Sequence, residues 1–141
     1  MTDALESETM YHVVMGVAPE DDTLGEKLEA VLDLPGEVRV SVVHVTDDPD
    51  DIESVPSVAR ALDTLGTAGV DARAVTRPGD PPRAVLDVAT EEDADCICVG
   101  ARRRTPAGKR GLRPGAQRIV VTADQPVLVV GDLPENETPR S

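Results

Sequence analysis

The chain has 141 residues, a length that fits one domain, and it carries 27 acidic against 14 basic side chains. Its formal net charge of -13 argues against general nucleic-acid binding, which needs a basic surface. Hydrophobic residues make up 40% of the chain but aromatic residues only 1%, so Val, Leu, Ile and Ala must fill the core. Such short aliphatic side chains suit a parallel sheet that is buried on both faces.

The composition also bears on where the protein works. A carboxylate-rich chain with Lys27 and Lys109 as its only lysines is typical of a halophilic protein, and an acidic, arginine-biased proteome is the alternative. The polar start MTDALESETM does not resemble a signal peptide, and no apolar run reaches the ~18 residues that a membrane span needs. We therefore expect a cytoplasmic location.

The first half of the chain predicts two strands and two helices. A strand is expected over 11–18, followed by a helix within 19–34 that Asp21 or Asp22 could cap. A second strand is expected over 38–45, and a second helix ends near Gly66 or Gly69. The predicted apolar stripes are Leu24, Leu28, Val31 and Leu32 on the first helix, and Val55, Val58, Ala59, Leu62 and Leu65 on the second.

The second half continues the alternation. Strands are predicted at 70–76, 94–100 and 126–131, with a helix opened by Pro81-Pro82 and another over about 114–123. Strands separated by helices predict right-handed crossovers and a doubly wound, five-stranded parallel sheet in a three-layer α/β sandwich. We expect one domain over 10–131, with a disordered tail at 1–9 and a flexible tail at 132–141.

The loop after the fourth predicted strand concentrates the positive charge of this acidic chain. Ligands of open α/β sheets bind beyond the carboxyl ends of the strands, and helix N-termini attract anions. This loop leads from such a strand end into a helix, so it is a candidate seat for phosphate. The proposed seat comprises Gly100, Arg102, Arg103, Arg104, Thr105, Gly108, Lys109 and Arg113. The alternative is that these cations pair with the chain's own carboxylates, within or between subunits.

Other reactive residues fit structural roles better. Cys96 and Cys98 share one face of a predicted strand, where buried free thiols are expected rather than a disulfide or metal site. His12 and His44 lie on different strands and are expected to be packed or edge histidines. The acidic stretch at 46–53 lacks the spacing of a calcium-binding loop and predicts a solvated loop, so no metal or catalytic residue is assigned.

The chain resembles the universal stress protein family over about 10–131. The resemblance rests on the order of elements, on PGDPPRAVLDVATEEDADCICVGARRRTPAGK and on AQRIVVTADQPVLVV. It implies a flavodoxin-like or Rossmann-like fold, a role in stress responses, ATP or AMP as candidate ligands, and a homodimer through the last strand, at Val127, Leu128, Val129 and Val130.

The sequence departs from the family's ATP-binding pattern at two places. The Gly-x2-Gly-x9-Gly-[Ser/Thr] motif falls on Gly100, Arg103, Arg113 and Pro114, so only its first glycine is kept. In the nucleotide-base region, at Val17 and Ala18, Ala18 stands where the family's ATP binders usually place Asp. Arginine resists the backbone conformations that glycine allows, and Pro114 offers neither a hydroxyl nor an N–H. These departures predict weakened ATP binding and leave a more electrostatic anion site.

Three functions remain open from the sequence. The first is a stress-response binding protein that holds a nucleotide or phosphate without turnover. The second is a weak ATPase or other phosphoryl-handling enzyme, for which Glu20 or Asp21 would hold the metal ion. The third is a dimeric interaction module that binds no nucleotide.

Overall fold

The computed structural model describes residues 10–19, 23–48, 55–100 and 114–130. The elements follow one another as β1 (Tyr11–Gly16), α2 (Leu24–Leu32), β2 (Val38–Val45), α3 (Pro56–Thr67), β3 (Asp71–Arg77), α4 (Pro81–Glu91), β4 (Cys96–Gly100), α5 (Pro114–Thr122) and β5 (Val127–Val130). The predicted alternation of strands and helices is confirmed. Within these ranges no helix is both long and apolar enough to cross a membrane.

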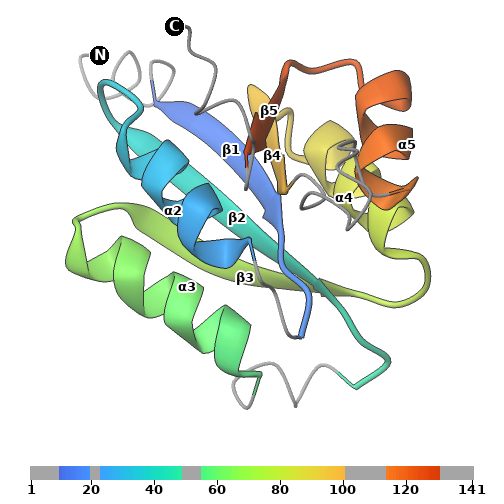
Figure 1. Cartoon of the computed structure of the whole chain (residues 1–141), viewed down its shortest axis with the longest axis horizontal. Coiled ribbons are helices and arrows are strands. Elements are labelled where there is room, and N and C mark those ends of the chain that lie inside the picture. Colours follow the sequence, from blue (N-terminus) through green and yellow to red (C-terminus); the bar gives the residue numbers. More distant parts are fainter. Residues whose placement is uncertain (1–9, 20–22, 49–54, 101–113, 131–141) are drawn as a thin grey trace, which may run out of the picture.

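The five strands form one parallel sheet in the order β3-β2-β1-β4-β5. Helices α2 and α3 cover one face of the sheet, and α4 and α5 cover the other (Figure 1). The chain adds strands in one direction from β1 to β3 and then crosses to the other side of β1 to form β4. The crevice between the carboxyl ends of β1 and β4 is therefore the topological switch point, where ligands of such sheets bind.

Two aliphatic clusters fill the layers between the sheet and its helices. Alternate residues of β1 separate them: Val13 and Met15 face α2 and α3, whereas Val14 faces α4 and α5. Each cluster is closed by short aliphatic side chains from the helices, as the composition predicted. Parallel strands that are apolar on both faces suit a sheet sandwiched by helices.

The helix predictions need three corrections. The N-cap position of α2 is Thr23 rather than Asp21 or Asp22, because the helix begins at Leu24. Leu32 is exposed at the last position of that helix. On α3 the buried stripe runs through Val58, Ala61 and Leu65, so Ala59 faces solvent.

Both cysteines are free and buried on β4, on the side of the sheet that α2 and α3 cover. Burial raises the pKa of the Cys96 thiol above its usual range. A thiol that stays protonated is a poor nucleophile and a poor metal ligand. The expectation of buried free thiols is confirmed.

Candidate functional site

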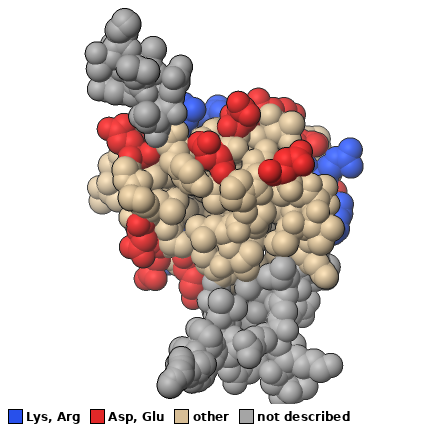
Figure 2. Space-filling view, turned by 90° about the horizontal axis from the view of Figure 1, so that it is seen from above, with Lys and Arg blue, Asp and Glu red and all other residues tan. Residues whose placement is uncertain are grey.

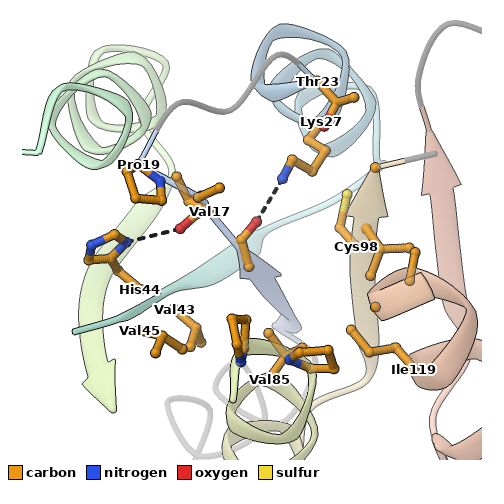
Figure 3. A pocket seen from close by; sticks show the side chains of 18 residues that line it. Val17, Pro19, Thr23, Lys27, Val43, His44, Val45, Val85, Cys98 and Ile119 are labelled. Atoms are coloured by element: carbon orange, nitrogen blue, oxygen red, sulfur yellow. Dashed lines mark hydrogen bonds between the residues drawn. The ribbon is translucent and has the colours of Figure 1, made fainter. Parts of the chain in front are cut away.

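A cavity of about 380 Å³ opens at the carboxyl end of the sheet, over the switch point. Its walls come from the ends of β1, β2 and β4 and from the first turns of α2, α4 and α5 (Figure 3). Binding sites for small molecules occupy cavities of this size, about 300–1,000 Å³, with mostly apolar walls and a few polar groups. The cavity is thus the candidate ligand site among the described residues.

The first helical turn of α4 gives the cavity an apolar wall. Pro81 and Pro82 have no N–H, and the N–H of Arg83 donates to the Asp80 carboxylate at 3.2 Å. The helix therefore has few free amides to offer an anion. Instead, Pro82 and Val85 line this side of the cavity.

The opposite side carries a lysine. Lys27 is on α2, its side chain points toward the end of β1, and its ammonium donates to the Gly16 carbonyl at 2.7 Å (Figure 3). The residue is only 4% exposed. Among the described residues that line the cavity, it alone is a Lys, Arg, Asp or Glu. The cavity therefore joins an apolar wall on α4 to a cationic group on α2.

Two hydrogen bonds hold the segment that follows β1. The His44 Nδ1 donates to the Val17 carbonyl at 3.0 Å, which assigns the hydrogen to Nδ1, because a carbonyl can only accept. The Ser57 hydroxyl donates to the Pro19 carbonyl at 2.9 Å. With its neighbours fixed on both sides, Ala18 lies exposed at the rim of the cavity. A preformed rim of this kind reduces the ordering cost of binding.

Glycines at the ends of β4 and β1 allow α2 and α4 to pack closely against these strands. A Cβ built on Gly100 would lie 2.8 Å from Thr23 Cβ and would also meet the Thr23 hydroxyl. A Cβ on Gly16 would lie 2.9 Å from Val85 Cγ2. The start of α2 thus packs directly on the end of β4, and α4 packs on the end of β1.

The structure brings together three residues of the predicted site. Gly100, Val17 and Ala18 all line the cavity, although they lie up to 83 positions apart in the chain. The remaining predicted residues, Arg102, Arg103, Arg104, Thr105, Gly108, Lys109 and Arg113, lie outside the described residues. So do Glu20 and Asp21, the carboxylates of the enzymatic alternative.

Sequence reasoning missed Lys27, Thr23 and the α4 wall. A signal for Lys27 was present, because it stands three residues after Leu24 and one before Leu28, on the buried stripe of α2. A charged residue on an apolar stripe faces the interior or a cavity. In the part of the chain that the structure describes, no three His, Cys, Asp or Glu side chains gather as a metal site would require.

The amino end of the sheet holds a second polar cluster. The His12 Nε2 lies 2.9 Å from the Ser41 hydroxyl and 3.3 Å from Glu92 Oε1. The Ser41 hydroxyl donates to the same carboxylate at 2.6 Å, and Arg73 pairs with its other oxygen at 2.5 Å. These four side chains form the amino-end network.

The amino-end network lacks the arrangement of a hydrolase. In a catalytic triad the serine and the carboxylate contact different nitrogens of the histidine, whereas here both contact Nε2. Ser41 is also completely buried, so no substrate reaches its hydroxyl. His12 and His44 are each 4% exposed, which confirms the expectation of packed histidines.

Burial lowers the pKa of His12 below its usual range, and the nearby Arg39 guanidinium acts in the same direction. The Glu92 carboxylate opposes both effects but does not outweigh them. His12 is therefore held in its neutral form, and its contact with Glu92 is a hydrogen-bonding arrangement rather than a full ion pair.

Comparisons with known proteins agree with this fold. A universal stress protein from Archaeoglobus fulgidus is 27% identical, with 85% of this chain and 98% of that chain covered and a TM-score of 0.72. The universal stress protein from the same organism in complex with dAMP is 25% identical, with 85% and 97% covered and a TM-score of 0.67. A universal stress family protein from Arabidopsis thaliana with AMP bound, 18% identical with 93% and 97% covered and a TM-score of 0.67, shows the likeness of fold alone.

No curated protein matches the chain in sequence. The model of the universal stress protein family, however, matches residues 10–131, which is most of the chain. This chain belongs to the universal stress protein family.

Proposed function

We propose that this protein is a stress-response binding protein that holds an adenine nucleotide in the carboxyl-end cavity without turning it over. The observation that carries the proposal is the cavity itself, which lies at the switch point and joins an apolar wall to the buried Lys27 ammonium. The universal stress protein from Archaeoglobus fulgidus in complex with dAMP, 25% identical, supports a nucleotide as the ligand.

The described lining favours binding without turnover. Phosphoryl transfer needs a metal ion or a base near the phosphates. The described residues that line the cavity include no Asp or Glu to hold a metal ion, and His44 is the one imidazole among them. The basic side chains between 101 and 113 follow Gly100 directly in the sequence, and we propose that they add positive charge to the ligand site.

We further propose a homodimer that forms through β5. This strand is at one edge of the sheet, and its four residues are only half-buried. Val121 on the neighbouring α5 is 77% exposed. Pairing two copies of β5 would cover an open strand edge and these apolar side chains. Light scattering tests it: Val121→Lys, which places a charge on the most exposed of these apolar side chains, should shift the protein to a monomer.

The setting that we propose is the cytoplasm of a cell with high internal salt. Two buried free thiols suit a reducing compartment. Acidic side chains are spread over the face shown in Figure 2, where basic ones are fewer. Screening by salt lowers the mutual repulsion of such a surface.

Calorimetric titration with ATP, AMP and inorganic phosphate, at low and high salt, tests the nucleotide proposal. We expect saturable binding of AMP and no product after prolonged incubation. Val45→Trp should weaken binding by narrowing the cavity, and Val55→Trp, at a half-buried position outside the cavity, is its matched control. If no nucleotide binds saturably at either salt concentration, the interaction module replaces this proposal.

A further inference from the structure

A second pocket, of about 530 Å³, lies at the amino end of the sheet. Val38, at the start of β2, lines it, whereas Val45, at the end of the same strand, lines the carboxyl-end cavity. Helices α2 and α3 both end at this pocket, on the left-hand side of Figure 1, beside the starts of β2 and β3. We call it the amino-end pocket, and its lining includes Leu32, Leu34, Glu37, Val38, Val70 and Asp71.

The floor of the amino-end pocket is apolar. Val31 and Val38 are buried there and belong to the aliphatic cluster under α2 and α3. Leu32, the last residue of α2, is 38% exposed. The other exposed large apolar residues in the described ranges, Val120 and Val121, lie on α5 beside the β5 edge. Leu32 therefore marks a separate apolar surface, and such a surface around a hollow suits the binding of another molecule.

The rim of the pocket is acidic. Glu37, just before β2, and Asp71, at the start of β3, are exposed, and neither forms an ion pair with any residue that the structure describes. The described lining contains no Lys, Arg or His. Arg39 follows closely in the sequence, but it alternates with Val38 and Val40 and so lies on the opposite face of the sheet. The two carboxylates are thus available to a cation from another molecule.

The ends of α2 and α3 add to the negative charge at the pocket. The carboxyl end of a helix carries a partial negative charge that favours cations within its last turn. Neither helix has a basic residue in that turn. Gly36 and Gly69, with φ of 77° and 86°, lie where the chain turns from these helices toward the strands, and a Cβ built on either meets nothing within 4 Å. No side chain at these positions separates the helix ends from an occupant.

We propose that the amino-end pocket binds a basic peptide segment of a partner protein, with an apolar side chain on the floor and an adjacent Arg or Lys beside Glu37 and Asp71. Charge complementarity selects this occupant, because an anionic one would be repelled and a purely apolar one would leave the carboxylates without partners. The floor and the carboxylates come from different elements, so an occupant needs both kinds of side chain in succession, as a peptide has. The inference goes beyond nucleotide binding and does not depend on it.

The first test titrates the isotope-labelled protein with short capped peptides and follows its amide signals by NMR. The peptide Arg-Leu-Arg should shift the signals of Gly36 and Gly69 and leave that of Gly100, at the carboxyl end, in place. Arg-Ser-Arg, which keeps the charges and loses the apolar side chain, should bind about tenfold more weakly. Glu-Leu-Glu should cause no shift. Equal binding of Arg-Leu-Arg and Arg-Ser-Arg, or no shift with any peptide, would overturn the proposal.

The second test separates the pocket from the acidic surface as a whole. Glu37→Gln and Asp71→Asn should each weaken the binding of Arg-Leu-Arg about twofold to fivefold, as for the loss of an exposed ion pair. Asp63→Asn is the matched control, because Asp63 is an exposed carboxylate on α3 outside the pocket lining, and this variant should bind as the wild type does. The same loss in all three variants would mean general attraction to an acidic protein and would contradict the proposal.

Light scattering without any peptide tests the other occupant, a second copy of this chain that offers its basic stretch at 101–113. We expect the mass of the protein to be the same in the wild type and in Glu37→Gln. Assembly of the wild type into larger particles that Glu37→Gln abolishes would identify a second copy as the occupant and would overturn the assignment to a partner protein.

Discussion

At the amino end of the sheet the buried polar side chains contact one another, whereas at the carboxyl end they border a cavity. His12 and Ser41 share hydrogen bonds with a carboxylate that an arginine also pairs with. Lys27 and His44 instead donate to main-chain carbonyls and line an open volume. The two histidines are equally buried, so burial does not distinguish the two ends.

The two ends differ in the partners of their buried polar side chains. In the amino-end network the Glu92 carboxylate contacts His12, Ser41 and Arg73, so the network joins β1, β2 and β3 to the end of α4. At the carboxyl end the Lys27 and His44 side chains bond to main-chain carbonyls, and the cavity beside them has room for a ligand. A residue such as Ser41, beside a histidine and a glutamate, has the composition of an active site without its geometry.

The largest effect should come from Gly100→Ala, which tests how closely the carboxyl end is packed. The new Cβ would lie 2.8 Å from Thr23 Cβ, and no rotamer change relieves a clash with a Cβ atom. The start of α2 must therefore move, at a cost of about 1–3 kcal/mol in the free energy of unfolding. The shift also displaces Lys27, so ligand binding should weaken along with stability; urea denaturation and calorimetry measure the two effects.

Gly66→Ala is the matched control for that substitution. Gly66 is within α3, and a Cβ added there meets nothing within 4 Å. We expect it to be neutral or to stabilise the protein by up to about 1 kcal/mol, because alanine favours a helix more than glycine does. Equal behaviour of the two alanine variants would show that α2 does not pack on the end of β4 in solution.

Ser41→Ala should change fewer properties than Gly100→Ala, because its effect is confined to stability. It removes the donor to Glu92 and a partner of His12 in a fully buried position, which costs about 1–3 kcal/mol. Ligand affinity should stay unchanged, because the amino-end network does not border the cavity. Ser57→Ala, which removes the hydrogen bond to Pro19 at the cavity rim, should instead alter affinity. A loss of affinity in Ser41→Ala would break the separation between the two ends.

The fold was largely predictable because its signals are local. The strand at 38–45 was predicted with the bounds that the structure has, since its β-branched run is flanked by Pro35-Gly36 and an acidic loop. The Pro81-Pro82 pair marked the start of α4 for a similar reason. The errors concern burial at positions where local periodicity does not decide it. Leu32, at the end of α2, was predicted on the apolar stripe but is exposed.

The cavity was only half predictable. The switch-point rule located Gly100 and the end of β1, because strand ends can be counted from the sequence. It did not identify Lys27, since a search for apolar periodicity passes over a charged residue on the stripe. The amino-end network was not predictable. The strand order and parallel register of β1, β2 and β3 bring residues 12, 41 and 73 together, and the end of α4 adds Glu92.

The smallest expected effect is a pH dependence of stability that arises from His12 in the amino-end network. Burial lowers the pKa of His12 in the folded protein, so the unfolded chain binds a proton first as the pH falls below about 6.5. The state that binds more protons gains as the pH falls, and the free energy of unfolding should therefore decrease in this range. Urea denaturation between pH 8 and pH 5 measures this slope.

His12→Gln isolates the contribution of this one side chain from that of the many carboxylates, which titrate in both proteins. Glutamine can still donate to Ser41 or Glu92 but takes up no proton, so the variant should lose less stability than the wild type between pH 6.5 and pH 5. A His12→Gln slope equal to that of the wild type would mean that His12 titrates alike in the folded and unfolded chains. The imidazole would then be as well solvated, or as well paired in its charged form, as it is in water, and the closed character of the amino-end network would be lost.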